Sequence, residues 1–137
     1  MRIDLRFAMA TSTEEILRRV DMSSEHAQGA FASHEYEDAM NAFDMARSML
    51  DEGLSRKDYG AYAELRRELR LNCSMAALYA GDCRRAEREA TKVLDASVDE
   101  DDAEAFLRRA LARARLGAFD RAAADVEAGL ACCGKGG

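Results

Sequence analysis

Proline and tryptophan are absent from this sequence, and glycine occurs only 9 times in 137 residues. Because proline interrupts helices and glycine destabilises their interiors, this scarcity removes the usual obstacles to long helices. Alanine, leucine, arginine and glutamate, which have high helix propensity, dominate instead. The composition therefore predicts an all-α chain, and the length fits one domain with a continuous core.

Long apolar runs are also missing, and none approaches the roughly 20 residues that a membrane-spanning helix needs. The first ten residues lack the basic, apolar and small-residue regions of a secretory signal. They alternate charged and apolar side chains, so we expect a loosely docked leader there, with a short strand or an amphipathic arm as alternatives. The sequence predicts no membrane partner.

An excess of positive charge is lacking, because 26 acidic residues outnumber 20 basic ones and the formal net charge is −6. A general nucleic-acid-binding surface needs clustered basic residues, so we expect no nucleic-acid partner. The 4 cysteines do not form the disulfide framework of a small secreted domain. We therefore expect free thiols and a cytoplasmic protein.

Signatures of catalysis and metal binding are absent too. The two histidines, His26 and His34, lie eight residues apart without a neighbouring cysteine, which does not match a zinc site. No phosphate-binding loop or nucleophile motif occurs. We expect no cofactor and no enzymatic activity, and the adjacent Cys132 and Cys133 are expected to be incidental to function.

The chain does contain a pattern that occurs twice, 36 residues apart. In each copy a helical stretch rich in small residues ends in a glycine, Gly81 or Gly117, and an alanine follows five residues after it. A related pattern occurs earlier, with His34 in the glycine position and Ala39 five residues later. A period in the thirties of this helix–turn–helix type predicts stacked helical hairpins.

Capping signals and periodicity predict where the helices lie. The capping box at Ser12 predicts a short helix through Val20. Further helices are expected at 22–33, from Tyr36 past Leu50, and at 61–80, 83–96, 103–116 and 119–131. The acidic run at 97–102 should cap the helix that follows it. Extra residues around the junction at 53–60 predict longer helices on both sides of that junction.

These helices predict three regions of the chain. A leader with a short helix is expected at 1–19, the helical repeats at 20–131 and a disordered tail at 132–137. Arginines within the helices, such as Arg66, Arg67 and Arg85, are expected on solvated faces beside glutamates.

The chain resembles a tetratricopeptide repeat (TPR) domain with three repeats, over residues 20–131. That family requires small side chains where the two helices of a hairpin touch. Most of the matching positions are small here: Ala27, Ala39, Ala46, Ser74, Ala86, Ala110, Ala122 and Gly129, with Val93 as the larger exception in the second repeat. Where the family has a large apolar residue, the three repeats have Phe43, Ala90 and Val126. The resemblance implies stacked antiparallel hairpins that form a right-handed superhelical groove. It also implies that His26 occupies a packing position.

The stretches 69–72 and 105–109 resemble the co-chaperone and immunophilin type of TPR domain in particular. In that type, two lysines, two asparagines and an arginine clamp the C-terminal Glu-Glu-Val-Asp tail of heat-shock chaperones. Asn72 and Arg108 match their clamp positions, and Gln28 keeps an amide where asparagine is expected. Ser24 and Glu104 stand where the two lysines are expected. The resemblance thus implies a carboxylate clamp without its lysine charges.

The concave face of such a stack should be apolar in its middle and acidic at one end. The acidic residues are Asp21, Glu25, Glu68 and Glu104. The candidate peptide-binding residues are Gln28, Asn72, Met75, Tyr79, Leu111, Arg108 and Arg115. The two arginines suit recognition of a carboxylate. As an alternative, apolar residues such as Met75, Leu78 and Leu111 belong to the core.

The leading hypothesis is an adaptor that binds a partner peptide or protein C-terminus in the concave groove. A heat-shock chaperone tail is one candidate partner, which would make the protein a chaperone co-factor. The alternative is a structural oligomerisation module that self-associates or docks in a larger assembly, because the exposed end of the last repeat needs a cover. A homodimer through that end is one form of this alternative.

Overall fold

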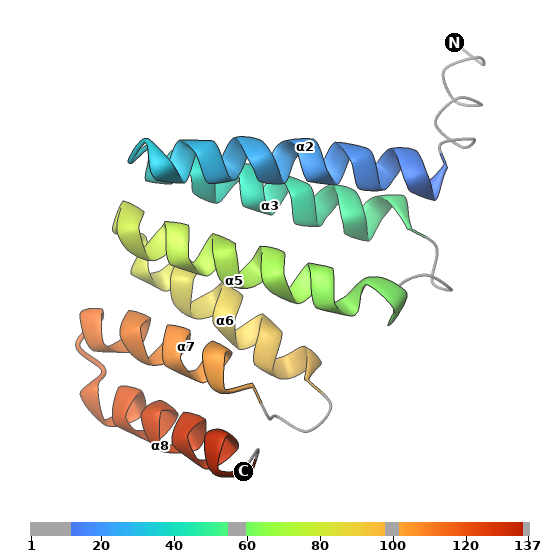
Figure 1. Cartoon of the computed structure of the whole chain (residues 1–137). Helices are drawn as coiled ribbons and strands as arrows, with labels where there is room; N and C mark the ends of the chain where they lie inside the picture. Colours follow the sequence, from blue (N-terminus) through green and yellow to red (C-terminus); the bar gives the residue numbers. More distant parts are fainter. Residues whose placement is uncertain (1–11, 55–59, 98–101, 136–137) are drawn as a thin grey trace.

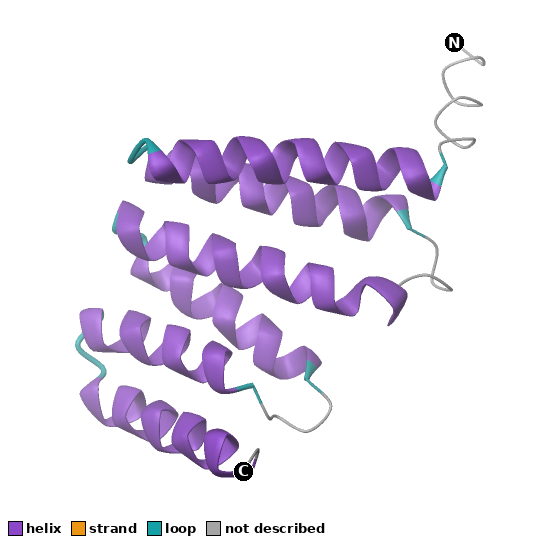
Figure 2. Cartoon of the chain, viewed as in Figure 1, coloured by secondary structure: helices purple, strands orange, loops and turns teal. Residues whose placement is uncertain are grey.

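The computed structural model describes residues 12–54, 60–97 and 102–135. These residues form six α-helices and one short 3-10 helix, without any strand among them. The elements are α2 (Thr13–Ala32), α3 (Tyr36–Gly53), η1 (Gly60–Tyr62), α5 (Ala63–Ala80), α6 (Cys83–Ala96), α7 (Ala103–Arg115) and α8 (Phe119–Lys135). The predicted all-α class is therefore confirmed (Figure 2).

The helices pair as three hairpins stacked in chain order. α2 packs on α3, α5 on α6 and α7 on α8, and neighbouring hairpins join where α3 meets α5 and α6 meets α7. Figure 1 shows α2, α5 and α7 as the front layer, with α3 and α6 behind them. The predicted stack of helical hairpins is confirmed, and α2, α5 and α7 present one common face.

One turn geometry closes all three hairpins. His34, Gly81 and Gly117 have positive φ angles of 64, 87 and 84°. The residue after each donates its backbone N–H to a carbonyl oxygen five positions back, at 2.8 Å in every case: Glu35 to Ala30, Asp82 to Ala77 and Ala118 to Arg113. A left-handed backbone favours glycine, which lacks the Cβ atom that crowds this conformation. The turn position predicted to be shared by His34 and the two glycines is confirmed.

Helix lengths and caps agree with the sequence. Ser12 caps α2 by accepting a hydrogen bond from the backbone of Glu15 at 3.1 Å. Asp102, the last residue of the predicted acidic cap, accepts one from the backbone of Ala105 at 3.1 Å. α3 and α5 beside the 53–60 junction have 18 residues each, which is longer than α6 with 14 and α7 with 13, although α2 has 20 and α8 has 17.

Two predicted boundaries are wrong. α2 continues without a break from Thr13 to Ala32, so the expected end near Val20 does not occur. Val20 has no exposed surface, and no proline or glycine interrupts the helix there. α8 runs to Lys135 instead of ending at Ala131, because one glycine in this stretch costs a helix only about 1 kcal/mol. Residues 1–11 of the leader and 98–101 of the acidic run lie outside the described residues.

Alanines are fully buried at many of the contacts between helices. Eight of them have no exposed surface: Ala27, Ala39, Ala46, Ala76, Ala77, Ala90, Ala105 and Ala112. Larger apolar side chains, such as Val20, Leu50 and Leu69, fill the space between these contacts. Because helix spacing depends on the side chains at the contact, the alanines allow close packing of the layers.

Acidic side chains are buried at equivalent places in the second and third hairpins. Glu89 on α6 is 1% exposed and Asp125 on α8 is 3% exposed, and the two lie 36 residues apart. Arg70 donates a hydrogen bond to Glu89 at 3.2 Å, and Arg109 donates two to Asp125 at 2.8 and 3.0 Å. A buried charge is tolerated when it is paired and hydrogen-bonded, so these arginines make the burial possible.

The prediction that the helical arginines lie on solvated faces is wrong for Arg66. This side chain is buried between hairpins and forms an ion pair with Asp51 of α3. Arg85 also reaches α3, where its guanidinium lies 3.0 Å from the Asp44 carboxylate. These contacts link residues far apart in sequence, so spacing along one helix could not reveal them.

Cys73 is a buried thiol between α3 and α5. It is 1% exposed, and its Sγ donates to the Met40 carbonyl oxygen at 3.5 Å. Burial, together with the nearby Glu89 carboxylate, raises the pKa of the Cys73 thiol to about 12. The folded protein therefore keeps this thiol protonated above its ordinary pKa.

Replacing this thiol by Cys73→Ala should remove a pH-dependent part of the stability. The unfolded thiol ionises near its ordinary pKa of 9.0, whereas the folded thiol keeps its proton to about pH 12. Between these values the unfolded state binds fewer protons, so the free energy of unfolding falls as pH rises, by at most about 1.4 kcal/mol per pH unit. Urea unfolding should show the advantage of the wild type over Cys73→Ala shrinking from about pH 9 to about pH 10.5.

The matched control is Ser74→Ala, which changes a neighbouring buried side chain that does not titrate in this range. Its stability difference from the wild type should stay constant with pH. A constant difference for Cys73→Ala as well would contradict a protonated buried thiol.

Candidate functional site

A pocket opens on the common face, between α2 and α5. It has a volume of about 350 Å³, and its lining residues are Gln28, Phe31, Phe43, Asn72 and Met75. α2 and α5 supply four of these side chains, and the buried Phe43 of α3 lies beneath them. The pocket therefore exists because α3 separates the two front helices, and its lining combines apolar side chains with two amides.

The two amides are available to a ligand. Gln28 donates to the Ser24 hydroxyl at 3.3 Å, which leaves its carbonyl oxygen as an acceptor. The exposed Asn72 side chain makes no hydrogen bond to another described residue. Because an amide offers both donors and acceptors, this pair suits the N–H and C=O groups of a peptide backbone.

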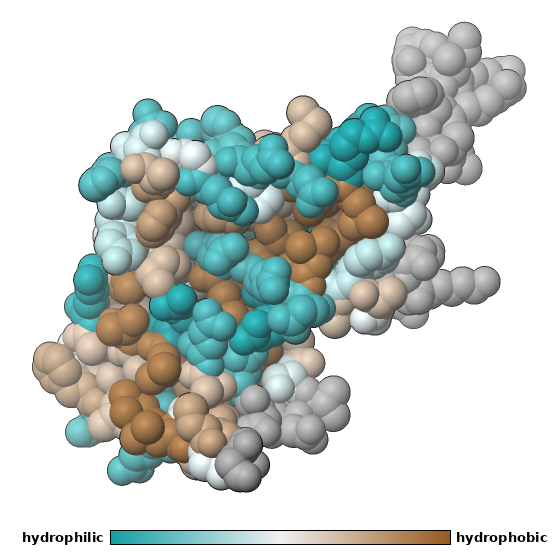
Figure 3. Space-filling view, viewed as in Figure 1, coloured by the Kyte–Doolittle hydropathy of each residue, from teal (hydrophilic) through white to brown (hydrophobic). Residues whose placement is uncertain are grey.

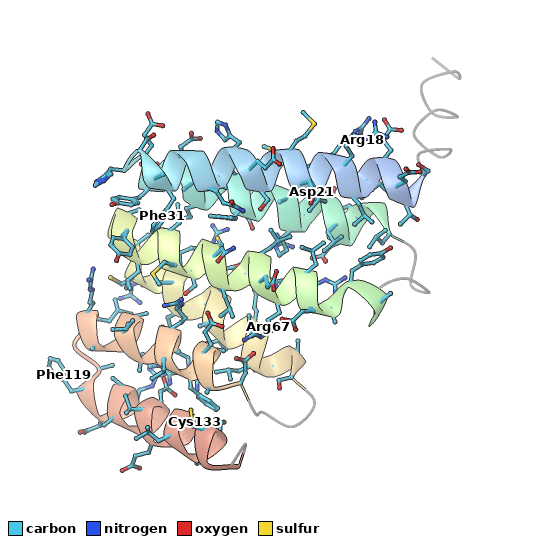
Figure 4. All side chains as sticks on the ribbon, in the orientation of Figure 1. Arg18, Asp21, Phe31, Arg67, Phe119 and Cys133 are labelled. Atoms are coloured by element: carbon cyan, nitrogen blue, oxygen red, sulfur yellow. The ribbon has the colours of Figure 1, made fainter. Side chains whose placement is uncertain are left out.

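An aromatic cluster, consisting of Phe31, Tyr36 and Tyr79, continues from the pocket toward the hairpin turns. Its three ring centroids lie 5.1 to 5.3 Å apart. Tyr79 remains 54% exposed, while Phe31 belongs to both the cluster and the pocket. Figure 4 labels Phe31 near the end of α2. The cluster gives the groove a fixed apolar surface with phenolic groups at its edge.

The predicted site residues of α7 lie outside this pocket. Leu111 is 46% exposed on α7. Arg108 donates to Glu104 at 3.3 Å, and Arg115 donates to the Leu78 carbonyl oxygen at 3.4 Å. Both cations predicted to bind a carboxylate therefore already have partners within the chain.

The structure brings some predicted site residues together and separates others. Gln28, Asn72 and Met75 line one pocket, and Tyr79 adjoins it through Phe31. Leu78 is 5% exposed, so the alternative interpretation as core is confirmed for this residue. The sequence did not reveal that Phe43 lines the pocket, because its position on the helix that starts at Tyr36 equally fits a contact inside the first hairpin. The binding role of the predicted residues stays a prediction.

Negative charge borders the pocket at one end. Asp21, Glu25 and Glu68 are exposed, and their side chains make no ion pair with another described residue. Glu104 differs, because Arg67 and Arg108 donate to it at 3.2 and 3.3 Å. The predicted acidic end thus contains three carboxylates without a cationic partner in the described part of the chain.

Arg67 is held by acidic side chains around the start of α7. It donates to Asp102 at 2.6 and 2.9 Å, and these hydrogen bonds hold the pKa of the Asp102 carboxyl below its usual value. A second cavity of about 250 Å³ lies beside Arg67, with Arg66, Arg70 and Lys92 in its lining. The arginines there pair with acids of the chain, so this cavity offers a weaker candidate site.

The structure of residues 12–54, 60–97 and 102–135 also bears on metal binding and on membrane spanning. No group of three or more histidine, cysteine, aspartate or glutamate side chains there could hold a metal ion. None of the helices formed by these residues is long and apolar enough to cross a membrane. The prediction that His26 occupies a packing position is wrong, because this side chain is exposed and its ring lies 3.1 Å from the Asp38 carboxylate. The four cysteines are free thiols.

Comparison with known proteins identifies the fold. No protein-family model matches the chain, and no curated protein matches it. Among solved structures, it is similar to the C-terminal TPR-containing domain of a Plasmodium falciparum protein described as an FK506-binding protein, with a TM-score of 0.70. The match covers 90% of this chain and 83% of that chain, at 15% sequence identity. The chain therefore has the TPR fold, and the predicted resemblance to the immunophilin type is confirmed at the level of fold.

The aromatic cluster should behave as a coupled unit. Tyr36 and Tyr79 stack at 5.1 Å between ring centroids, so a double-mutant cycle with Tyr36→Ala and Tyr79→Ala should give a coupling energy of about 1 kcal/mol. Urea unfolding of the four proteins measures it. Tyr62→Ala, in η1 just before the start of α5 and far from Tyr79, is paired with Tyr79→Ala as the control and should show coupling near zero. Equal coupling in both cycles would contradict a specific ring contact.

Proposed function

We propose that this protein is a non-enzymatic adaptor that binds an extended segment of a partner protein in the pocket between α2 and α5. The TPR fold supports a protein–protein interaction module. The observation that carries the proposal is the exposed pocket, which combines Phe31, Phe43 and Met75 with the amides of Gln28 and Asn72. Free thiols fit a cytoplasmic location, which we include in the proposal.

The pocket chemistry suits one apolar side chain on a peptide backbone. A leucine-sized side chain that leaves water there gains about 2 kcal/mol. The two amides then pair with the backbone on either side of it, and the aromatic cluster contacts the next residues. All the lining residues belong to helices, so the site is largely preformed and loses little entropy on binding.

The C-terminal tail of a heat-shock chaperone is the candidate that the resemblance supplies. Arg108 would hold its carboxylates, but Glu104 already accepts from Arg108 at 3.3 Å. Ser24 and Glu104 also occupy the positions where the clamp has lysines. These features favour an apolar segment over a tail rich in carboxylates, and the chaperone tail remains the less favoured partner of the same groove.

Met75→Glu should abolish peptide binding, because it places a charge in the apolar pocket without a partner. Since the partner is unidentified, the probe is a phage-displayed library of random nonapeptides, selected on the immobilised protein. Met45→Glu is the matched control, because Met45 is 60% exposed on α3 and does not line the pocket. Wild type and Met45→Glu should enrich peptides that Met75→Glu does not bind. Absence of enrichment on the wild type, or equal enrichment on Met75→Glu, would overturn the proposal.

A second candidate function rests on the last hairpin. Leu107 and Leu130 are 46% and 64% exposed, whereas Leu71 and Leu94, their equivalents 36 residues earlier, are 3% and 5% exposed. The earlier pair is buried because α7 covers it, with Ala105 in the contact. Figure 3 shows apolar surface over the α7 and α8 region. As the alternative, we propose that a second copy of this chain covers the surface, which makes the protein an oligomerisation module.

Leu130→Glu separates this alternative from a monomeric adaptor. If a second copy covers the last hairpin, light scattering should give the wild type about twice the chain mass of 15.1 kDa and Leu130→Glu the single mass. Met22→Glu, at a 64% exposed site on α2, is the control and should keep the mass of the wild type. A wild-type monomer at high concentration would remove the oligomerisation function and leave the adaptor.

A further inference from the structure

We propose that the groove selects a positively charged segment, in which a lysine or arginine lies two or three positions from the apolar residue that enters the pocket. This inference rests on the proposed function, and it specifies the chemical class of the partner. The evidence for it is the group of acidic residues beside the pocket. The fold does not require these side chains, and they do not line the pocket.

The acidic residues form a row across the front face. Asp21, Glu68 and Glu104 each lie 13 residues before the positive-φ residue that closes their hairpin. They therefore occupy equivalent places on α2, α5 and α7, which lie together in the front layer (Figure 1). Glu25 follows Asp21 by one helical turn. An acidic row of this kind attracts a cation that approaches the face.

The row keeps a net negative charge because its cations are already engaged. Arg108 pairs with Glu104, and Arg67 is shared between Asp102 and Glu104. Arg18 lies on the edge of α2 away from α5 in Figure 4. Asp21 and Glu68 have no competing partner among the described residues, whereas Glu25 lies two turns after Arg18, on the same side of α2, and contributes its charge from farther away.

The distance between the row and the pocket sets the spacing in the ligand. Asn72 follows Glu68 by four residues and Gln28 follows Asp21 by seven, which corresponds to about 6 to 10 Å along the helices. An extended peptide advances about 3.3 Å per residue. A basic residue two or three positions from the apolar anchor thus reaches the row while the anchor remains in the pocket.

The same carboxylates oppose an acidic ligand. A glutamate at that place in the peptide would meet like charge on both α2 and α5, and like-charge contacts at an interface suppress a wrong partner. The groove therefore differs in its charge preference from a clamp that grips a carboxylate tail.

Two experiments test the inference: the nonapeptide selection, and binding measurements on a variant protein whose acidic row is neutralised. We expect enriched peptides to combine an apolar residue with lysine or arginine two or three positions away. Synthetic versions of the best peptide carry lysine, glutamine or glutamate at that place. The lysine peptide should bind most tightly and the glutamate peptide most weakly, with roughly a tenfold difference in affinity between these two at low salt. The triple variant Asp21→Asn, Glu25→Gln, Glu68→Gln should lose this preference but keep binding of the glutamine peptide, measured by fluorescence anisotropy.

The matched control neutralises Asp95, Asp120 and Glu127, three exposed acids of α6 and α8, to the corresponding amides. It changes the net charge equally and should keep the preference for lysine. The inference would be overturned if the enriched peptides contained mainly acidic residues at that place. It would also be overturned if the triple variant still bound the lysine peptide more tightly than the glutamate peptide. In both cases the adaptor function stands. Failure to enrich any peptide on the wild type overturns both.

Discussion

The close approach of helices at alanine positions is the constraint on which the rest of this structure depends. Alanines such as Ala27, Ala76 and Ala112 have no exposed surface, and each lies where one helix meets another. A one-carbon side chain brings backbones together and excludes water, but it contributes little apolar surface of its own. The larger side chains, among them Val20 and Leu50, must therefore fill the remaining gaps. This division explains why small residues recur in register while large apolar residues vary between repeats.

Exclusion of water at these contacts changes what the charged residues do. Glu89 and Asp125 lie at equivalent places in successive hairpins and are almost fully buried, and arginines of the adjacent helices pair with both. Four arginines are used in these buried pairs: Arg70, Arg85, Arg109 and Arg113. The exposed acids Asp21, Glu25 and Glu68 have no cationic partner among the described residues. Buried acids are thus paired within the second and third hairpins, while the acids of the front face are left exposed.

Local features of this protein could be predicted where one short stretch sets the geometry. The glycine turns at Gly81 and Gly117, and the equivalent turn at His34, have the shared left-handed backbone that the repeat implied. The continuity of α2 was missed because the capping signal shows where a helix begins and gives no end. Arg66 was placed on a solvated face because its partner, Asp51, belongs to another hairpin. The Arg66 error concerns an interaction between segments that are distant in the sequence, whereas the α2 error concerns a boundary within one helix.

The all-α class, the period of the hairpins, their turns and the small residues at their contacts could be predicted from the amino acids alone, because each depends on neighbours within about one repeat. The packing of the hairpins was needed to show that Gln28, Asn72 and Met75 share a pocket above Phe43, and that Arg108 pairs with Glu104. It also decided that Leu78 is core while Leu130 is exposed. Burial and charge pairing depend on which hairpin lies next to a residue, and the last hairpin has no described neighbour on its outer side.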